Sequence, residues 1–202
     1  MKKFEVFVWP LALMMLVVVS GCGNSGSTFD QLVSERRSVR SYDATKKVTE
    51  DEVRTLIATA QEAPSWANVQ GTSYYAVMSQ DKLQALQPIM GSNAKNIADV
   101  NVVLVTTFKQ GASGFFDGQA SNELGDGWGA FDNGLSNAFL ILKAKDMGFD
   151  TLIMGLRDAD GLRRLLDIPN DEVVTSVIAL GYGKAVPNRP MRKQLHEILH
   201  IK

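Results

Sequence analysis

A run of apolar and β-branched residues at 100–108 is the feature that most constrains this fold. Valine, leucine and threonine fill almost every position instead of alternating with polar residues, which indicates a strand buried on both faces. A second run at 173–180 predicts another strong strand, which ends at Gly181-Tyr182-Gly183. We therefore expect helices packed around a small sheet.

Two segments carry the signals of long helices. Thr49 and Glu52 form a capping box, with threonine at the N-cap and glutamate three positions later, and Pro64 marks the stop of that helix. Residues 128–147 predict the central helix, and Gly148 stands where a glycine commonly ends a helix. The central helix carries its large apolar side chains on one stripe: Phe131, Leu135, Phe139 and Leu142.

Shorter elements fill the remainder of the chain. Strands are predicted over 73–79 and 151–154, and helices over 80–90 and 158–166. Residues 109–127 are rich in Gly, Ser, Asn and Asp without a period, which predicts a long loop that is either functional or mobile. Because strands and helices do not alternate in a strict βαβ rhythm, we expect the α+β class.

The first 21 residues have the pattern of an export signal. A basic start and an apolar run lead to Val19-Ser20-Gly21-Cys22, which resembles the cleavage site of a bacterial lipoprotein. We expect a signal peptide over 1–21, a lipid on Cys22, a flexible tether over 22–27 and one domain over 28–202. The alternative is an uncleaved transmembrane anchor, for which the apolar run is short.

Cys22 is the only cysteine, which excludes disulfides, cysteine zinc sites and a cysteine nucleophile in the core. The formal net charge of −1 lacks the basic excess of proteins that bind nucleic acid. An exported domain without disulfides must be held together by its core or by a partner subunit. The tail over 184–202 cannot bury much within its own chain, so we expect it to pack on a partner.

Arg36-Arg37-Ser38-Val39-Arg40 places three guanidiniums and a hydroxyl within five residues. Guanidinium groups bind phosphate bidentately and stay charged at any working pH, so the segment has the chemistry of a phosphate cradle. The alternative interpretation is a solvated basic face that follows a short helix.

Two other motifs are interpreted as accidental. Residues 196–200 match the zinc-protease pattern H-E-x-x-H, but only two residues follow and the chain has no other histidine for a third ligand. Gly181-Tyr182-Gly183 lacks the third glycine of a dinucleotide loop, and no helix opens after it. We expect neither a metal site nor a Ser-His-Asp arrangement, because both histidines lie in the tail.

Residues 28–193 resemble the nitroreductase family of FMN-dependent oxidoreductases through segments that occur in the right order. The segment 35–42 is similar to the family signature R-R-S-x-R-x-[FY], and 63–70 is similar to A-P-S-x-x-N-x-Q. Residues 132–156 resemble the central helix, strand and glycine turn, and 190–195 resemble the basic tail. The resemblance implies a nitroreductase-like fold, with a small mixed or antiparallel sheet flanked by helices, in an intertwined homodimer.

The resemblance also implies an FMN site with one wall near the arginine cluster. Arg36 and Ser38 would contact the phosphate and ribityl chain of FMN, with Arg37 close by. Arg40 would approach the pyrimidine edge of the flavin, where a cation stabilises the charge of the reduced ring. Two tail residues would complete the phosphate clamp: Arg192 and Lys193.

A second wall is implied by the segment 63–70 and the glycine turn. Pro64, Ser65 and Asn68 would reach the flavin of the other subunit, because family members form dimers with two shared sites. The backbone of Gly155 and Leu156 would lie beside the flavin N5, where a glycine allows the main chain to approach the ring closely.

The implied activity is ping-pong hydride transfer through FMN, from NAD(P)H to a nitroaromatic, quinone or similar acceptor, with no catalytic protein side chain. The predicted export would leave the protein lipid-anchored in the cell envelope, on the periplasmic or outer-membrane side, where little NAD(P)H is expected. Two alternatives follow: an exported lipoprotein that binds or stores flavin, and a dimeric envelope module that has lost flavin.

The chain departs from the family pattern at two places. Gly71-Thr72 replaces the usual Pro-Trp, so the wall near the flavin has a different shape. The loop over 109–127, which in the family lies near the substrate entrance, has no recognisable motif. The sequence therefore leaves the identity of the acceptor open.

Overall fold

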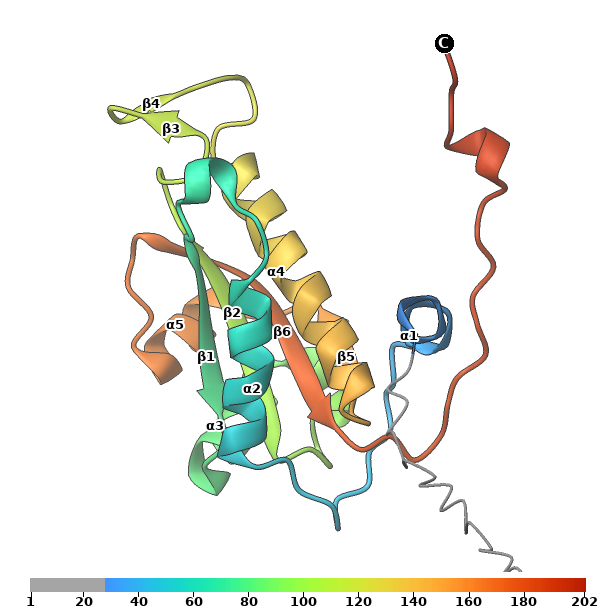
Figure 1. The fold of residues 1–202 in the computed structure, drawn as a ribbon. Coiled ribbons are helices and arrows are strands. Elements are labelled where there is room, and N and C mark those ends of the chain that lie inside the picture. The colour runs from blue at the N-terminus through green and yellow to red at the C-terminus, as the bar shows by residue number, and fades with distance from the viewer. Residues whose placement is uncertain (1–27) are drawn as a thin grey trace, which may run out of the picture.

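The computed structural model describes residues 28–202, and a four-stranded sheet lies at the centre of this part of the chain (Figure 1). The strand order is β1-β2-β6-β5, and every neighbouring pair is antiparallel. The strands are β1 (Thr72–Val77), β2 (Val102–Lys109), β5 (Asp150–Met154) and β6 (Glu172–Gly181). The predicted signal, Cys22 and the tether over 22–27 lie outside the described residues.

The two central strands form the middle of the core. In β2 every residue from Val102 to Phe108 is buried, and alternate side chains join apolar clusters on opposite faces of the sheet. Residues 176–181 of β6 are buried as well. The prediction of a strand buried on both faces is therefore confirmed, and burial of these β-branched side chains is the main source of sheet stability.

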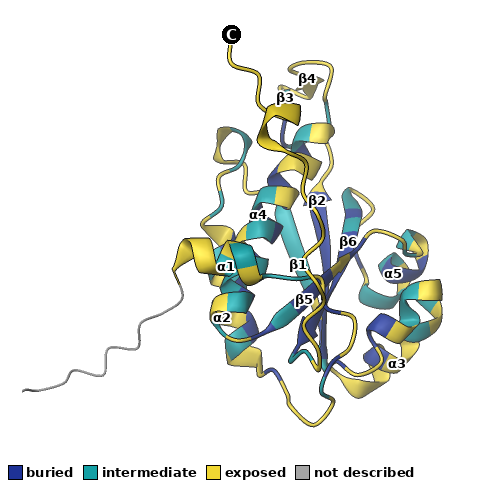
Figure 2. Cartoon of the chain, turned by 90° about the vertical axis from the view of Figure 1, so that its right-hand side faces the viewer, coloured by how far each residue is buried: buried dark blue, intermediate teal, exposed yellow. Residues whose placement is uncertain are grey.

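Five α-helices cover the sheet in two layers (Figure 2). One layer holds α1, α2 and α4, and the other holds α3 and α5. Their bounds are α1 (Phe29–Glu35), α2 (Glu50–Gln61), α3 (Gln80–Ile89), α4 (Gly127–Asp146) and α5 (Ala159–Leu166). Within residues 28–202, none of the helices has the length and apolar character that crossing a bilayer requires.

The predicted helix ends are confirmed by the hydrogen bonds at the termini. The Glu52 N–H donates to Thr49 Oγ1 at 3.3 Å, and the Thr49 N–H donates to Glu52 Oε2 at 2.7 Å, so the capping box is formed. Gly148 follows α4 with a φ of +82°, a conformation that glycine adopts at little cost.

The apolar stripe of α4 does not face the sheet. Phe131 is 55% exposed and Phe139 is 39% exposed. Polar side chains of the helix are buried against the strands instead. They include Asp132, Asn133, Ser136 and Asn137. A polar helix face can be buried because its groups find partners, so the phenylalanines are left on the outer surface.

The long loop over 109–127 contains structure that its composition did not predict. It forms a small hairpin of β3 (Phe115–Phe116) and β4 (Gln119–Ala120). Asp117 and Gly118 make the turn with φ values of 48° and 76°, as a two-residue hairpin turn requires. The hairpin projects beyond one end of the sheet, next to the start of α4 (Figure 1).

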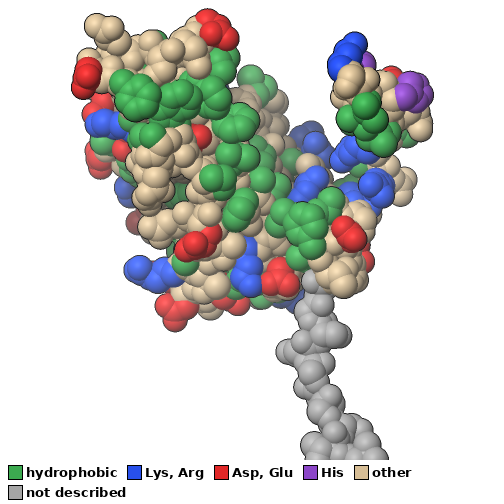
Figure 3. Space-filling model, turned by 45° about the horizontal axis from the view of Figure 1, so that its top comes forward, with side chains coloured by type: hydrophobic (Ala, Val, Ile, Leu, Met, Phe, Trp, Pro, Cys, Tyr) green, Lys and Arg blue, Asp and Glu red, His purple; other side chains and the backbone are tan. Residues whose placement is uncertain are grey.

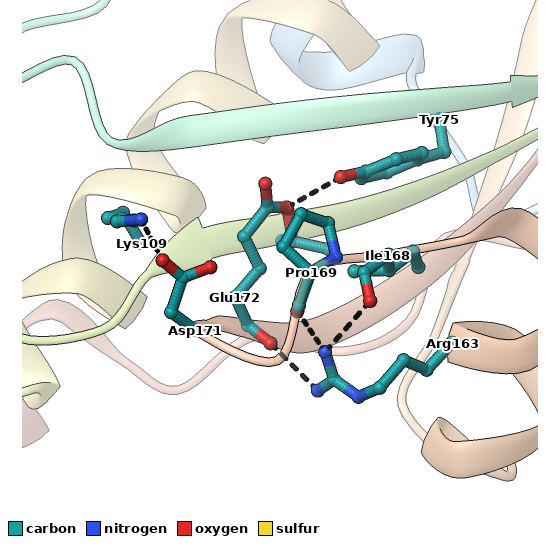
Figure 4. Close-up of polar contacts among 8 residues, drawn as sticks. Tyr75, Lys109, Arg163, Ile168, Pro169, Asp171 and Glu172 are labelled. Atoms are coloured by element: carbon teal, nitrogen blue, oxygen red, sulfur yellow. Dashed lines mark hydrogen bonds and ion pairs between the residues drawn. The ribbon is translucent and has the colours of Figure 1, made fainter.

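The start of β6 is clamped to its neighbours by polar contacts (Figure 4). The guanidinium of Arg163, on α5, donates to the carbonyl oxygens of Pro169 and Glu172, the latter at 2.8 Å. The carboxylate of Glu172 accepts from the Tyr75 hydroxyl at 3.0 Å and from the Thr107 hydroxyl. These bonds join α5, β1, β2 and β6 at one corner of the sheet.

The C-terminal tail leaves the domain after β6. Residues 184–202 are exposed, and Figure 3 shows the far part of the tail standing apart from the body of the molecule. Its only regular element is η3 (Leu195–Glu197), a single 3-10 turn. Apolar side chains of the tail are therefore open to solvent within one chain, Met191 by 96%.

Substitutions at two glycines of α4 test how this helix packs against the sheet. Gly129→Ala is expected to lower the free energy of unfolding by about 1–3 kcal/mol, because the added Cβ would overlap the buried ring of Phe108. Gly134→Ala is the matched control, since a Cβ there meets nothing within 4 Å, and it is expected to stabilise by roughly 0.5–1 kcal/mol. Urea unfolding measures both changes. Equal effects of the two substitutions would contradict the orientation of α4.

Candidate functional site

The segment Arg36–Arg40 lies along β5. Ser38 forms a β-bridge with Thr151, and the Val39 N–H donates to the Thr151 carbonyl at 3.1 Å. The Val39 side chain is buried, whereas Ser38 and Arg40 are exposed. The alternation fixes the backbone to the edge of the sheet and leaves the polar side chains on the surface.

Positive charges gather beside this segment. Burial lowers the pKa of the Arg36 guanidinium, and the nearby charges of Arg192 and Arg37 lower it further. The ion pairs among residues 28–202 include neither these arginines nor Arg40 and Lys193. The structure therefore brings the tail arginine near the predicted cradle, and the cluster has excess positive charge.

Arg37 is turned toward its own helix. Its Nη1 donates to the carbonyl oxygens of Ser34 at 2.6 Å and Arg36 at 2.9 Å, which places a cation at the C-terminus of α1. This contact explains how Arg37 can lie close to the cradle without pointing into it. Its Nε is buried and has no acceptor within the described chain.

The predicted glycine turn follows β5 directly. A Cβ added at Gly155 would have no neighbour within 4 Å, and Leu156 is 70% exposed, so the turn faces open space. Arg157 Nη1 donates to the Gly155 carbonyl at 3.0 Å, and Asn93 Nδ2 donates to the Leu156 carbonyl at 2.8 Å. Both predicted residues thus follow β5, the edge strand that the arginine segment bridges at Thr151, and their carbonyls are held by two side chains that the sequence did not single out.

Asn93 belongs to a pair of asparagines that the sequence could have indicated only weakly as structurally important. It lies in η2 (Gly91–Asn96), and its Oδ1 accepts from Nδ2 of the buried Asn96 at 3.0 Å. Two asparagines in the segment between a helix and a strongly apolar strand indicate a structured loop. Their target, a carbonyl 63 residues further along the chain, could not be read from the sequence.

The second predicted wall is a strained loop between α2 and β1. It contains η1 (Trp66–Asn68), and three residues have positive φ without being glycine: Ala67 at 44°, Asn68 at 57° and Gln70 at 53°. Such conformations persist where surrounding bonds enforce them. Here the Trp66 N–H donates to the buried carboxylate of Asp132 at 3.0 Å.

Ser65 contributes to the same loop. Its Oγ accepts from the Gln70 N–H at 2.9 Å, and its carbonyl accepts from the Asn68 N–H at 3.1 Å. Pro64 and Asn68 are exposed, and Ser65 is half-buried. The three predicted contact residues of this wall are therefore close together and held in one conformation.

An aromatic cluster covers this loop. The Trp66 ring centroid lies 4.7 Å from that of Trp128 and 6.0 Å from that of Phe116 on the hairpin. Phe131 extends the cluster, with its centroid 5.6 Å from that of Trp128. Apolar side chains gather on the face that carries the hairpin in Figure 3. The indole Nε1 of Trp66 is buried and has no acceptor within residues 28–202.

A cavity of about 450 Å³ opens beside the loop. Its lining includes Ser65, Tyr74, Asp132 and Ser136. Tyr74 and Ser136 share a hydrogen bond of 2.8 Å, and burial raises the pKa of Tyr74 to about 12, so this hydroxyl stays neutral. Because Asp132 is the charged group in the lining, the cavity would repel a phosphate.

The two walls do not meet within one chain. Trp66 contacts α4 at Asp132, whereas α1 packs near the other end of this helix, where Phe29 and Leu32 border a hollow with Phe139. The seven steps from residue 132 to residue 139 already span about 10 Å of helix at 1.5 Å each, and the arginine segment follows α1 and bridges β5. The predicted site residues therefore form two separate groups, and their contacts with a cofactor stay predictions.

The segment that matches H-E-x-x-H lacks the geometry of the zinc motif. Only Leu195–Glu197 is helical, so His196 and His200 do not share one turn of an α-helix. The carboxylate of Glu197 accepts from the Gln194 N–H at 2.7 Å. Over residues 28–202, no group of three His, Cys, Asp or Glu side chains is arranged to hold a metal ion.

Comparison with known proteins decides the family. A family model described as "Nitroreductase family" matches residues 33–182. The chain belongs to the nitroreductase family. The matched region contains both walls and the glycine turn, whereas Arg192 and Lys193 lie beyond it. The α+β nitroreductase-like fold predicted from the ordered segments is confirmed.

A curated relative supports the assignment over most of the chain. "Putative NAD(P)H nitroreductase MhqN" of Bacillus subtilis is 26% identical over 200 residues, which cover 85% of this chain and 97% of that protein. "Protein DrgA" of Synechocystis is 25% identical over 201 residues, which cover 85% of this chain and 94% of that protein.

Solved structures share the fold of this nitroreductase-family chain. A nitroreductase-family protein from Streptococcus pneumoniae aligns with a TM-score of 0.77 at 21% identity, covering 87% of this chain and 100% of that one. An NADPH:FMN oxidoreductase from Vibrio harveyi, complexed with NAD⁺, aligns with a TM-score of 0.73 at 24% identity, covering 85% and 76%. At these identities the likeness establishes the architecture.

Proposed function

We propose that this protein is an FMN-dependent oxidoreductase that takes electrons from NAD(P)H and reduces a nitroaromatic, quinone or similar acceptor. The observation that carries the proposal is the cluster of Arg36, Arg37 and Arg192, which lacks carboxylate partners and lies along β5, the strand that leads into the open Gly155 turn. Family membership supports it, as does the Vibrio harveyi relative, which is itself described as an NADPH:FMN oxidoreductase.

The donors of the two walls fit such a cofactor. Within residues 28–202, three buried side-chain nitrogens have no acceptor, and all three lie in or next to the predicted site segments: Arg37 Nε, Trp66 Nε1 and Arg157 Nε. Buried donors without partners are uncommon in folded proteins. A ligand rich in phosphate and carbonyl oxygens provides the acceptors that these segments require.

Each wall has a distinct role in this proposal. Arg36 and Arg192 bind the phosphate, Ser38 binds next to it, and Arg40 faces the pyrimidine edge. The cavity beside Ser65 and Asp132 suits the neutral part of the ligand, since its carboxylate disfavours phosphate. FMN, when bound, supplies the two-electron chemistry, so the protein needs to bind and orient rather than donate protons.

A second candidate function is an exported lipoprotein that binds or stores flavin without turnover. The predicted lipoprotein signal and Cys22 favour it, because a protein beyond the inner membrane has little access to NAD(P)H. A dimeric envelope module without flavin would have the same fold but would not need the arginine cluster for binding. These functions differ in what a purified protein does with FMN and NAD(P)H.

The visible spectrum of purified residues 22–202 tests the proposal. We expect a yellow protein whose absorbance is bleached by NAD(P)H under anaerobic conditions and restored by a quinone or nitroaromatic acceptor. A yellow protein that NAD(P)H does not bleach would favour the storage function. A colourless protein that takes up no FMN would contradict both.

Arginine variants are the matched controls of this experiment. Arg36→Ala is expected to weaken FMN binding by roughly 1.5–3 kcal/mol, the scale of a hydrogen bond to a charged group. Arg54→Ala removes a solvent-exposed arginine of α2 that pairs with Glu50, and it is expected to leave the affinity unchanged. Equal affinities of Arg36→Ala and the unaltered protein in a fluorescence titration would contradict the assignment of the cradle.

We also propose that the active form is a homodimer with two shared FMN sites. The separation of the two walls in one chain supports this, because the arginine wall of one copy can complete the Ser65 wall of the other. The exposed phenylalanines of α4 and the apolar tail provide surface for a second copy. Large exposed apolar surfaces commonly mark interfaces.

Light scattering tests the dimer. Residues 22–202 are expected to have twice the mass of one chain, and deleting 195–202, which retains Arg192 and Lys193, is expected to raise the dimer dissociation constant because four exposed apolar side chains are lost. A monomer that binds FMN as tightly as the unaltered protein would contradict a shared site.

The cellular location is proposed from the signal alone. We propose that the protein is lipid-anchored through Cys22 in the cell envelope, on the periplasmic or outer-membrane side. Labelling cells with a radioactive fatty acid is expected to mark the unaltered protein and not the Cys22→Ala variant. Recovery of the unlabelled full-length precursor from the cytoplasm would contradict the anchor.

A further inference from the structure

We infer that Arg157 and Asn93 are positioning residues that orient the Gly155–Leu156 peptide and strengthen its N–H as a donor toward the reduced cofactor. The inference rests on the proposed FMN function and goes beyond it, because neither residue belongs to the segments that resemble the family. It depends on four hydrogen bonds that hold the backbone between β5 and α5 in one conformation.

The carbonyl groups of Gly155 and Leu156 are each held by a side chain. Arg157 Nη1 binds the Gly155 carbonyl at 3.0 Å, and Asn93 Nδ2 binds the Leu156 carbonyl at 2.8 Å. The turn is further fixed by the Asp158 N–H, which donates to the Ile89 carbonyl at 3.3 Å. The peptide planes therefore have little freedom to rotate.

Fixing a carbonyl also fixes the N–H of the same peptide. In a planar trans peptide the C=O and the following N–H point in opposite directions. The Leu156 N–H consequently points away from Arg157, and the Arg157 N–H points away from Asn93. Within residues 28–202 neither of these N–H groups has an acceptor. A Cβ added at Gly155 would meet nothing, so the turn leaves room for a ligand to accept from these two adjacent donors.

The guanidinium adds charge to this geometry. Arg157 bridges the Gly155 carbonyl and the Val174 carbonyl of β6, the latter through Nη2 at 2.5 Å. A planar fork can hold two acceptors at once, which a lysine ammonium on a flexible stem does less well. A cation on the carbonyl polarises the peptide, so the Leu156 N–H becomes a better donor to negative charge.

This arrangement predicts an effect on the cofactor's electron affinity. Reduction adds negative charge to the flavin, and a polarised donor favours the reduced form over the oxidised form. Removing the Arg157 charge should therefore weaken binding of reduced FMN more than binding of oxidised FMN. A residue that only stabilised the fold would weaken both forms equally.

Arg163 provides a matched control (Figure 4). It is also a half-buried arginine whose guanidinium clamps backbone carbonyls at the edge of β6, those of Pro169 and Glu172. None of its hydrogen bonds reaches residues 155–156. Arg157→Met and Arg163→Met therefore remove equivalent clamps, and only the first removes a charge from the turn.

The experiment measures the midpoint potential of bound FMN and the affinity for oxidised FMN in the two variants. For Arg157→Met we expect the preference for reduced FMN to fall about tenfold, which moves the two-electron potential by about 30 mV to more negative values. Arg163→Met is expected to lower the unfolding midpoint in urea and to leave the potential unchanged. A potential that is unchanged in Arg157→Met, with FMN bound, would overturn the inference.

Further variants keep the test informative if Arg157→Met does not fold. Arg157→Lys retains the charge but loses the fork, and Asn93→Ala removes a neutral donor, so both are expected to shift the potential in the same direction by less. Unchanged potentials in both would overturn the inference while leaving the proposed function intact. If the unaltered protein binds no FMN, the proposed function fails and the inference fails with it.

Discussion

The buried polar contacts between α4 and the sheet are the constraint on which the rest of the structure depends. Asn133 Nδ2 donates to the Thr107 carbonyl at 3.1 Å, and Asn133 Oδ1 accepts from the Thr175 hydroxyl at 2.8 Å. Leaving amide and hydroxyl groups unpaired in a core costs free energy. These bonds therefore fix both the position of α4 along its axis and its rotation about that axis. The rotation places Asp132 under the η1 loop and turns Phe131 outward. Loop conformation and exposed aromatic surface are thus two results of one set of contacts.

The sequence predicted those parts of the fold that depend on neighbouring residues. The capping box at Thr49 needs only three further positions, and the run at 102–108 is apolar enough to indicate its own burial. The facing of α4 was not predictable in this way, because Asn133 meets a threonine 42 positions away. A periodic stripe identifies a helix, but the partners available to its polar face decide which side is buried.

The residues of the candidate site also differ in how far the sequence could predict them. Arg36, Ser65 and Gly155 stand in short segments that resemble family motifs, so the sequence could propose them as site residues. Asn93 and Arg157 act through backbone carbonyls, which carry no sequence signature, and either residue type is ordinary on a surface. What the structure adds is that both side chains bind carbonyls of one turn. It also shows that the two groups of motif residues lie apart in one chain, a property that spacing along the sequence does not reveal.

The aromatic cluster beside the η1 loop has an optical consequence. The chain contains three tryptophans, and the two within residues 28–202 are Trp66 and Trp128, which are in contact with each other. Intrinsic emission from this part of the chain therefore originates at a single place, next to the strained loop and the hairpin. The other described residues contribute to the intrinsic fluorescence only through their tyrosines. A ligand, a partner or a loop movement at this place would change the emission directly.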